Sequence, residues 1–206
     1  MYARTTTVWG RPGSIDDGIA SIRGAVMPEL QKMHGFVGLS LLADRESGRC
    51  IATSAWQSED DMRASGPLIR EVRDRAAQTL GGAPEIAEWE IAVMHRDHDS
   101  AEGTCVRVGW AKVDPARMDA GIDLFKDSVL PAFEELEGHC SASLMVNRHT
   151  GLVVVSTAFD SADALHRTMG KLDTLRDDTV AEAGAEMLEE CDFELAIAHL
   201  RVPELV

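Results

Sequence analysis

The sequence repeats itself once, at a fixed spacing of 103 residues. Residues 51–65, IATSAWQSEDDMRAS, return as residues 154–168, VVSTAFDSADALHRT, with Phe159 in place of Trp56. The same spacing aligns identical residues along most of the chain, including the pairs Pro28/Pro131, Gly35/Gly138, Gly48/Gly151 and Arg73/Arg176. Proline is rarely tolerated inside a helix, and glycine is favoured at helix ends and hairpin turns because of the backbone conformation there. The recurrence of these residues at one spacing indicates a duplicated domain.

The period of the apolar residues predicts the same six elements in each copy. In the first copy these are strand 2–9, helix 15–33, strand 36–43, strand 49–57, helix 58–80 and strand 87–95. In the second copy they are strand 105–113, helix 115–136, strand 140–146, strand 152–159, helix 161–183 and strand 193–200. The predicted domains are residues 1–97 and 104–206, joined by a polar linker at residues 98–103.

Two local details of the first copy carry more specific expectations. Ser14 and Ser58 each precede acidic residues and an apolar period, which is typical of helix N-caps. Pro28 should kink the first helix or tighten its last turns, and the pair Gly66–Pro67 is a candidate break in the second helix.

The order βαββαβ predicts an α+β fold of tandem ferredoxin-like repeats. The two crossovers in a repeat return to the same side, so both helices cover one face of an antiparallel sheet. The other face is too apolar for solvent. Pairing the two open faces hides both, which predicts a pseudo-dimeric α+β barrel within one chain. The sequence leaves open whether the chain dimerises further.

Composition limits the partners. A formal net charge of −15 argues against nucleic acid and against an anionic membrane surface, because both need a basic face. The apolar runs are shorter than a spanning helix, and the N-terminus has no signal-peptide pattern. Four scattered cysteines without a CxxC pair, and histidines without HExxH spacing, predict a reduced cytoplasmic protein that binds no metal.

A glycine–phenylalanine pair, a hairpin with Arg and Gly, and a strand ending Trp-x-Ser-x-Asp before a helix resemble the antibiotic biosynthesis monooxygenase (ABM) superfamily. In the first copy this pattern is carried by Gly35–Phe36, Arg45, Gly48, Trp56, Ser58 and Asp60. In the second copy it is carried by Gly138, Arg148, Gly151, Phe159, Ser161 and Asp163. The resemblance covers nearly the whole chain as two copies and implies the dimeric α+β barrel fold.

The resemblance also implies a range of activities. Members of the superfamily include cofactor-free oxygenases of aromatic polyketides, haem-degrading enzymes and proteins of no known activity. Many members have a histidine in the second helix, where Ser65 and Thr168 stand here, and the haem-degrading branch adds an asparagine on the first strand. The single asparagine, Asn147, lies in a hairpin turn, which disfavours haem degradation.

Several residues are candidates for a site. His95 is a candidate general base because the pKa of imidazole lies near neutrality, and Trp56 is the residue that lines the family's pocket. The candidate substrate-binding residues are Arg4, Trp9, Trp89, Trp110, Phe159 and His199. Core packing is an equal alternative for Trp56, and a structural role is the commoner one for His95 and His199. Arg4 and its counterpart Arg107 could bind an acidic or phenolate group.

These observations lead to three hypotheses of function. The first is a cofactor-independent monooxygenase of the ABM type that acts on a small aromatic or quinol-like metabolite. The second is a non-catalytic member of the same fold that binds a small apolar molecule or a protein partner, and the third is a haem-binding member. If one copy alone keeps a pocket, we expect it in the first, which retains Trp56 and Trp89.

Overall fold

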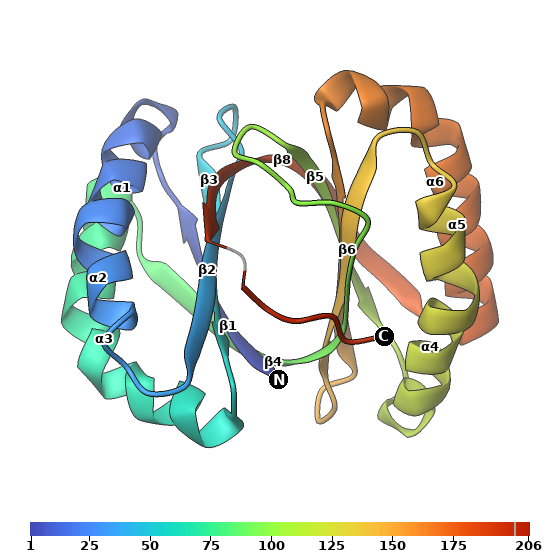
Figure 1. The fold of residues 1–206 in the computed structure, drawn as a ribbon, viewed down its shortest axis with the longest axis horizontal. Coiled ribbons are helices and arrows are strands. Elements are labelled where there is room, and N and C mark those ends of the chain that lie inside the picture. Colours follow the sequence, from blue (N-terminus) through green and yellow to red (C-terminus); the bar gives the residue numbers. More distant parts are fainter. Residues whose placement is uncertain (200) are drawn as a thin grey trace. The chain divides into compact units, whose positions relative to one another are not determined.

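The computed structural model describes residues 1–199 and 201–206. Its strands are β1 Tyr2–Trp9, β2 Phe36–Ala43, β3 Arg49–Trp56, β4 Pro84–Arg96, β5 Cys105–Lys112, β6 His139–Asn147, β7 Leu152–Phe159 and β8 Glu186–His199. Its helices are α1 Ile15–Ser21, α2 Met27–Leu30, α3 Glu59–Leu80, α4 Met118–Leu124, α5 Leu130–Glu134 and α6 Ala162–Ala183. The predicted βαββαβ order is therefore present twice (Figure 1).

The two last strands begin earlier than the sequence period predicts. β4 starts at Pro84 instead of residue 87, and β8 starts at Glu186 instead of residue 193. The first residues of both strands are largely exposed and mix polar with apolar side chains, so they lack the apolar alternation that marks a strand in sequence. Leu200, the predicted end of the last strand, lies outside the described residues.

The strands are hydrogen-bonded in the order β1-β3-β2-β8-β5-β7-β6-β4, which closes into a barrel. This confirms the predicted α+β barrel of two ferredoxin-like repeats. The chain divides into two compact units, residues 1–89 with 194–202, and residues 90–193 with 203–206. The last strand of each repeat therefore starts in one unit and ends in the other. The predicted domain ranges follow the duplication along the sequence and stay a prediction.

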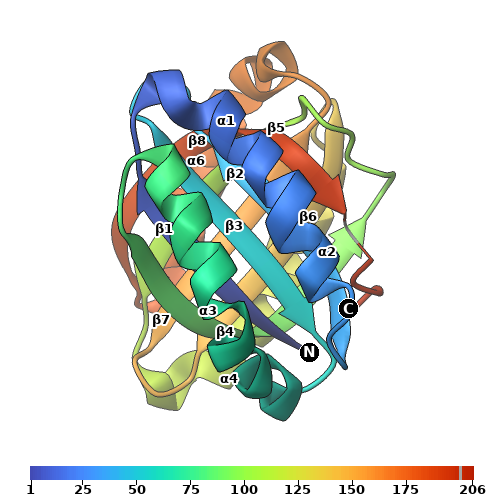
Figure 2. The ribbon, with the colours of Figure 1, turned by 90° about the vertical axis from the view of Figure 1, so that its left-hand side faces the viewer.

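In the first unit, helices α1, α2 and α3 cover one face of the sheet (Figure 2). In the second unit, α4, α5 and α6 cover one face of its sheet in the same way (Figure 1). Each unit buries its own apolar cluster between helices and sheet, around Trp56 in the first and Phe159 in the second. Within the described residues, none of the helices combines the length and apolar character that a membrane crossing requires.

The two helical prolines have the same effect in both repeats. A π-helical turn, Ile22–Val26, joins α1 to α2 just before Pro28, and its counterpart, Phe125–Val129, precedes Pro131. Proline lacks an N–H and crowds the carbonyl four residues earlier, so a widened turn relieves the helix. In contrast, α3 runs through Gly66–Pro67 without a break, and the candidate break there is wrong.

The long helices begin at serine caps. The Ser58 hydroxyl accepts a hydrogen bond from the Asp61 N–H at 3.1 Å, and the Ser161 hydroxyl accepts one from the Ala164 N–H at 3.2 Å. Ser14 was also expected to cap its helix, but its side chain makes no cap hydrogen bond.

We predict that Ser58→Ala and Ser161→Ala each lower the free energy of unfolding by about 0.5–2 kcal/mol, because each loses a cap hydrogen bond. Ser14→Ala is the control and should change stability by less than about 0.5 kcal/mol. Urea unfolding followed by circular dichroism measures all three. Equal losses in the three variants would contradict the assignment of the caps.

Candidate functional site

Each unit has a cavity between its helices and its sheet. The cavity of the first unit has a volume of about 50 Å³, and the cavity of the second unit has a volume of about 140 Å³. We expected the pocket in the first repeat, and this expectation is wrong, because the larger of the two cavities lies in the second unit. Neither Phe159 nor Phe193 lines the larger cavity, which is bordered by the rings of Phe125 and Phe133.

A large-to-small exchange at the end of the second long helix contributes to the larger cavity. Leu80 ends α3 and packs on Gly18, where an added Cβ would lie 2.1 Å from Leu80 Cδ2. Its counterpart at the end of α6 is Ala183, and an added Cβ on the matching Gly121 would meet nothing within 4 Å. The space that the leucine side chain occupies in the first unit is therefore empty in the second.

Two strand positions widen the same cavity. Thr6 and Val8 on β1 line the first cavity, and at the 103-residue spacing Gly109 and Ala111 on β5 line the second. Together with Leu80 and Ala183, these make three matched positions of the two cavity walls at which the second unit has the smaller side chain.

One end of the second cavity is polar. Arg107 on β5 and Thr157 on β7 are partners in the antiparallel ladder, so their side chains share the face that α6 covers. Both are buried, with exposed fractions of 9% and 3%. The rest of the lining is dominated by valine, leucine, methionine and phenylalanine, so this cavity combines an apolar body with a few polar groups.

The Thr157 hydroxyl is buried without a hydrogen-bond partner. Its counterpart Ser54 accepts a hydrogen bond from the indole N–H of Trp56 at 3.1 Å and donates to the Arg4 carbonyl at 3.3 Å. Phe159 replaces Trp56 in the second repeat and has no N–H to donate. Buried hydroxyls are nearly always hydrogen-bonded, so an unpartnered one in a cavity wall indicates room for a polar ligand atom.

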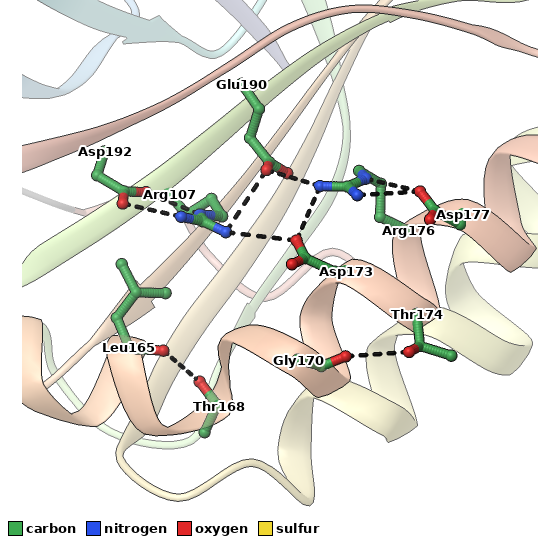
Figure 3. Close-up of polar contacts among 10 residues, drawn as sticks. All are labelled: Arg107, Leu165, Thr168, Gly170, Asp173, Thr174, Arg176, Asp177, Glu190 and Asp192. Carbon is green, nitrogen blue, oxygen red and sulfur yellow. Dashed lines mark hydrogen bonds and ion pairs between the residues drawn. The ribbon is translucent and has the colours of Figure 1, made fainter.

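A network of charged groups holds Arg107 in place (Figure 3). The guanidinium donates to both carboxylate oxygens of Asp192, at 2.7 and 2.9 Å, and lies 3.5 Å from Glu190. Arg176 donates to the same Glu190 oxygen and to Asp173, both at 2.9 Å. The hydrogen bonds that Arg107 donates to Asp192 raise the pKa of Arg107 and outweigh its burial, so the buried guanidinium stays charged.

The first unit pairs its buried arginine differently. Arg4 donates to Glu88, to the Ser65 hydroxyl at 2.8 Å and to the Met62 carbonyl at 2.7 Å. Ser65, which stands where the resemblance implied a histidine, is therefore a partner of Arg4. In the second unit the matching Thr168 instead donates to carbonyls of its own helix.

The structure brings two of the predicted site residues together. Trp56 and Arg4 line the cavity of the first unit. Trp9 is about half exposed, with the Arg49 guanidinium 4.6 Å above its ring, and Trp89 is buried and donates to Thr5 at 2.9 Å.

The other predicted residues lie outside the linings of both cavities. Trp110 meets Phe193 edge to face at 6.4 Å, and Phe159 packs in the second core against His139. His199 stacks on Phe36 with 6.3 Å between ring centroids.

His95, the predicted base, lies among carboxylates. Its Nε2 atom is 3.1 Å from Asp97 and 3.0 Å from Glu134, and its Nδ1 atom is 3.2 Å from Glu204.

Haem does not suit the residues present. Ser65 and Thr168 stand where the resemblance implied a ligating histidine, and their hydroxyls donate to backbone carbonyls of their own helices. The described residues that line the second cavity include neither histidine, cysteine nor tyrosine. Met118 and Met187 lie in the lining, but methionine holds haem iron together with a histidine, which the lining lacks.

Comparison with solved structures places the chain in a class. No protein-family model matches the sequence. An anthrone oxidase-like protein superimposes with a TM-score of 0.68 at 13% identity over 96% of this chain and 91% of its own. A ferredoxin-fold protein of Listeria monocytogenes related to antibiotic biosynthesis monooxygenases gives 0.54 at 11% identity, over 94% of each chain. The chain thus has the fold of the ABM-related α+β barrels, as the resemblance implied.

Closer relatives exist in Mycobacterium tuberculosis. The uncharacterized proteins Rv2557 and Rv2558 are 54% and 52% identical to this chain across its full length, which covers 92% and 88% of theirs. The chain belongs to the family of Rv2557 and Rv2558.

The decisive residues of the larger cavity were not singled out from the sequence. Thr157, Glu190 and Ala183 have no chemical motif around them. A residue-by-residue comparison of the two copies does contain the signal, because Leu80 becomes Ala183 and Trp56 becomes Phe159 at one spacing.

We predict opposite effects on stability for two matched hydroxyl deletions. Thr157→Val removes a buried hydroxyl that has no partner and should leave the free energy of unfolding unchanged or raise it by up to about 1 kcal/mol. Ser54→Ala leaves the buried Trp56 N–H unsatisfied and should lower it by about 1–3 kcal/mol. Urea unfolding decides the point, and an equal loss in both variants would mean that Thr157 is hydrogen-bonded.

We also predict a pH-dependent contribution from His199. Burial and then the nearby charge of Arg201 lower its pKa, so the folded protein resists its protonation. As pH falls below 6.5, the unfolded chain binds a proton that the folded chain does not, and stability falls. His199→Gln should therefore lose less stability than the wild type between about pH 7 and 5. Urea titrations of both proteins at several pH values measure the free energy of unfolding. A loss of stability that is the same in the wild type and in His199→Gln would refute this prediction.

Proposed function

We propose that this protein is a cofactor-independent monooxygenase of the ABM type, and that a small aromatic substrate binds in the cavity of the second unit. The observation that carries the proposal is the Thr157 hydroxyl, which is 3% exposed, lacks a hydrogen-bond partner and lines an apolar cavity beside Arg107 and Glu190. A substrate oxygen can accept or donate the missing hydrogen bond.

The size and lining of the cavity favour an aromatic ring. Its volume of about 140 Å³ is close to that of an engineered apolar cavity that binds benzene. The rings of Phe125 and Phe133 offer edge and face contacts to a second aromatic system. Thr179, Val180 and Ala183, near the end of α6, are partly exposed, whereas their counterparts in the first unit are buried, so larger substrates can extend toward solvent there.

The polar end can support oxygenation without a cofactor. Without a cofactor, the substrate itself must supply the electrons that reduce O₂. A methylene carbon of the substrate first loses a proton, and the resulting carbanion then reacts with O₂ to give a carbonyl group and water. Arg107 and Thr157 can stabilise the negative oxygen of the enolate, because they are fixed in a site that excludes most water. Glu190 is the nearest carboxylate in the lining and would take the proton, which requires a substrate with an acidic C–H.

A non-catalytic ligand-binding protein is the alternative. It is favoured by the ion pairs of Glu190 with Arg107 and Arg176, since a carboxylate that is already paired with two guanidinium groups is less available to contact a substrate C–H. The first cavity, with Trp56 and Arg4, is a second location for the same chemistry.

We predict that the purified protein consumes O₂ with at least one member of a panel of anthrones, whose methylene carbon carries the acidic C–H that the step requires. Ala183→Leu fills the cavity as Leu80 does in the first unit, and Thr157→Val removes the polar anchor. Each should lower kcat/KM by about 10- to 100-fold, the value of one or two lost contacts. Thr174→Val, which removes an exposed hydroxyl from the same helix, is the control and should leave kcat/KM unchanged.

Other outcomes assign the alternatives. Binding of the same compounds without O₂ consumption, detected by calorimetry and lost in Ala183→Leu, supports the ligand-binding protein. Turnover that survives Ala183→Leu and is lost in Trp56→Phe moves the reaction to the first unit. Neither binding nor turnover with any compound of the panel would refute the proposal.

A further inference from the structure

Three chain segments of the second unit bring an imidazole, a thiol and a carboxylate together. His98 follows β4, Cys140 is the second residue of β6, and Asp160 follows β7. Asp160 Oδ1 lies 2.9 Å from His98 Nε2 and 3.3 Å from Cys140 Sγ, and the three donor atoms all lie within 4.8 Å of one another. None of the three residues lines the cavity of the second unit, so this group is separate from the proposed oxygenase site.

The arrangement is peculiar to one repeat. At the spacing of 103, Cys140 corresponds to Val37 and Asp160 to Gln57. The last strands of the two copies align at 104, as Trp89 with Phe193, and at that spacing His98 corresponds to Val202. Two valines and a glutamine offer no comparable ligand set. The group is therefore not a requirement of the fold, because the first unit builds the same turns without it.

We propose that His98, Cys140 and Asp160 form a zinc-binding site. Zinc prefers nitrogen and sulfur ligands with some carboxylate, and a tetrahedral site holds its donor atoms about 3.3–3.6 Å apart. The separations of 2.9 and 3.3 Å are close to this range. His98 and Asp160 are exposed and can adjust, while the buried Cys140 provides the fixed ligand.

The charges of the bound site balance. Cys140 would lose its S–H proton to solvent and bind as a thiolate, His98 would bind through neutral Nε2, and Asp160 would bind as a carboxylate. One thiolate and one carboxylate neutralise the two positive charges of zinc, with water as the fourth ligand. Soft sulfur distinguishes this site from one for Mg²⁺ or Ca²⁺, which prefer oxygen.

A neighbouring group of His95, Asp97 and Glu134 is a weaker candidate. Its donors are already satisfied, because His95 contacts three carboxylates and Asp97 also bonds the buried His139 at 2.6 Å. It has one nitrogen, no sulfur and two partly exposed carboxylates, a set that commonly occurs without a metal.

The test uses the untagged full chain. After dialysis against a small excess of Zn²⁺ and then buffer, elemental analysis should find one zinc per chain. Co²⁺ should give the near-ultraviolet thiolate-to-cobalt absorption band that only a cysteine ligand produces. His98→Gln and Asp160→Gln, both at exposed positions, should weaken Zn²⁺ binding at least tenfold in a competition titration with a chromophoric chelator. Cys140→Val, the residue of the first repeat, should abolish the cobalt band.

Two control variants locate the metal. The double variant Cys105→Ala/Cys191→Ala removes the other partly exposed thiols and should keep both the zinc and the cobalt band. Glu134→Gln, in the neighbouring group, should also keep them. Zinc that is absent from the wild type, or retained equally by His98→Gln and Asp160→Gln, would overturn the proposal. Because these exposed variants can be checked for folding by circular dichroism, a failure of Cys140→Val to fold does not affect the outcome.

Discussion

A buried arginine beneath the helices is the constraint on which both repeats depend. A guanidinium removed from water must be paired with a carboxylate and must keep its remaining N–H groups hydrogen-bonded. The last strand of each repeat supplies that carboxylate, Glu88 to Arg4 and Asp192 to Arg107. This pairing ties the first strand to the last in each repeat and fixes a polar end on an otherwise apolar space.

Given this shared frame, the two repeats differ through a few side chains. In the first unit the indole N–H of Trp56 donates to the hydroxyl of Ser54, and Leu80 fills the space over Gly18. In the second unit, Phe159 has no N–H to donate to the hydroxyl of Thr157, and Ala183 leaves the space over Gly121 open. A duplicated domain allows this division, because one copy can keep the stability of the fold while the other gains a cavity and an unpaired hydroxyl.

The second unit also holds chemical groups that the first one lacks. The cavity, the charged network around Arg107 and the group of His98, Cys140 and Asp160 all belong to one unit. In the first unit, Gln57 and Val202 stand at the matching positions of the ligand group. Both the oxygenase proposal and the zinc proposal therefore concern residues of the second unit.

The sequence by itself determined the duplication, the order of the elements and the barrel class, because apolar periods and paired Pro and Gly residues are local signals that survive without a structure. The starts of β4 and β8 were missed, since their exposed ends carry no period. Only the tertiary structure decided which repeat has the larger cavity. The volume of a cavity depends on contacts between residues far apart in the sequence, such as Leu80 on Gly18. Whether the buried hydroxyl of Thr157 finds a hydrogen-bond partner depends on such contacts as well, and the local spacing of residues encodes neither property.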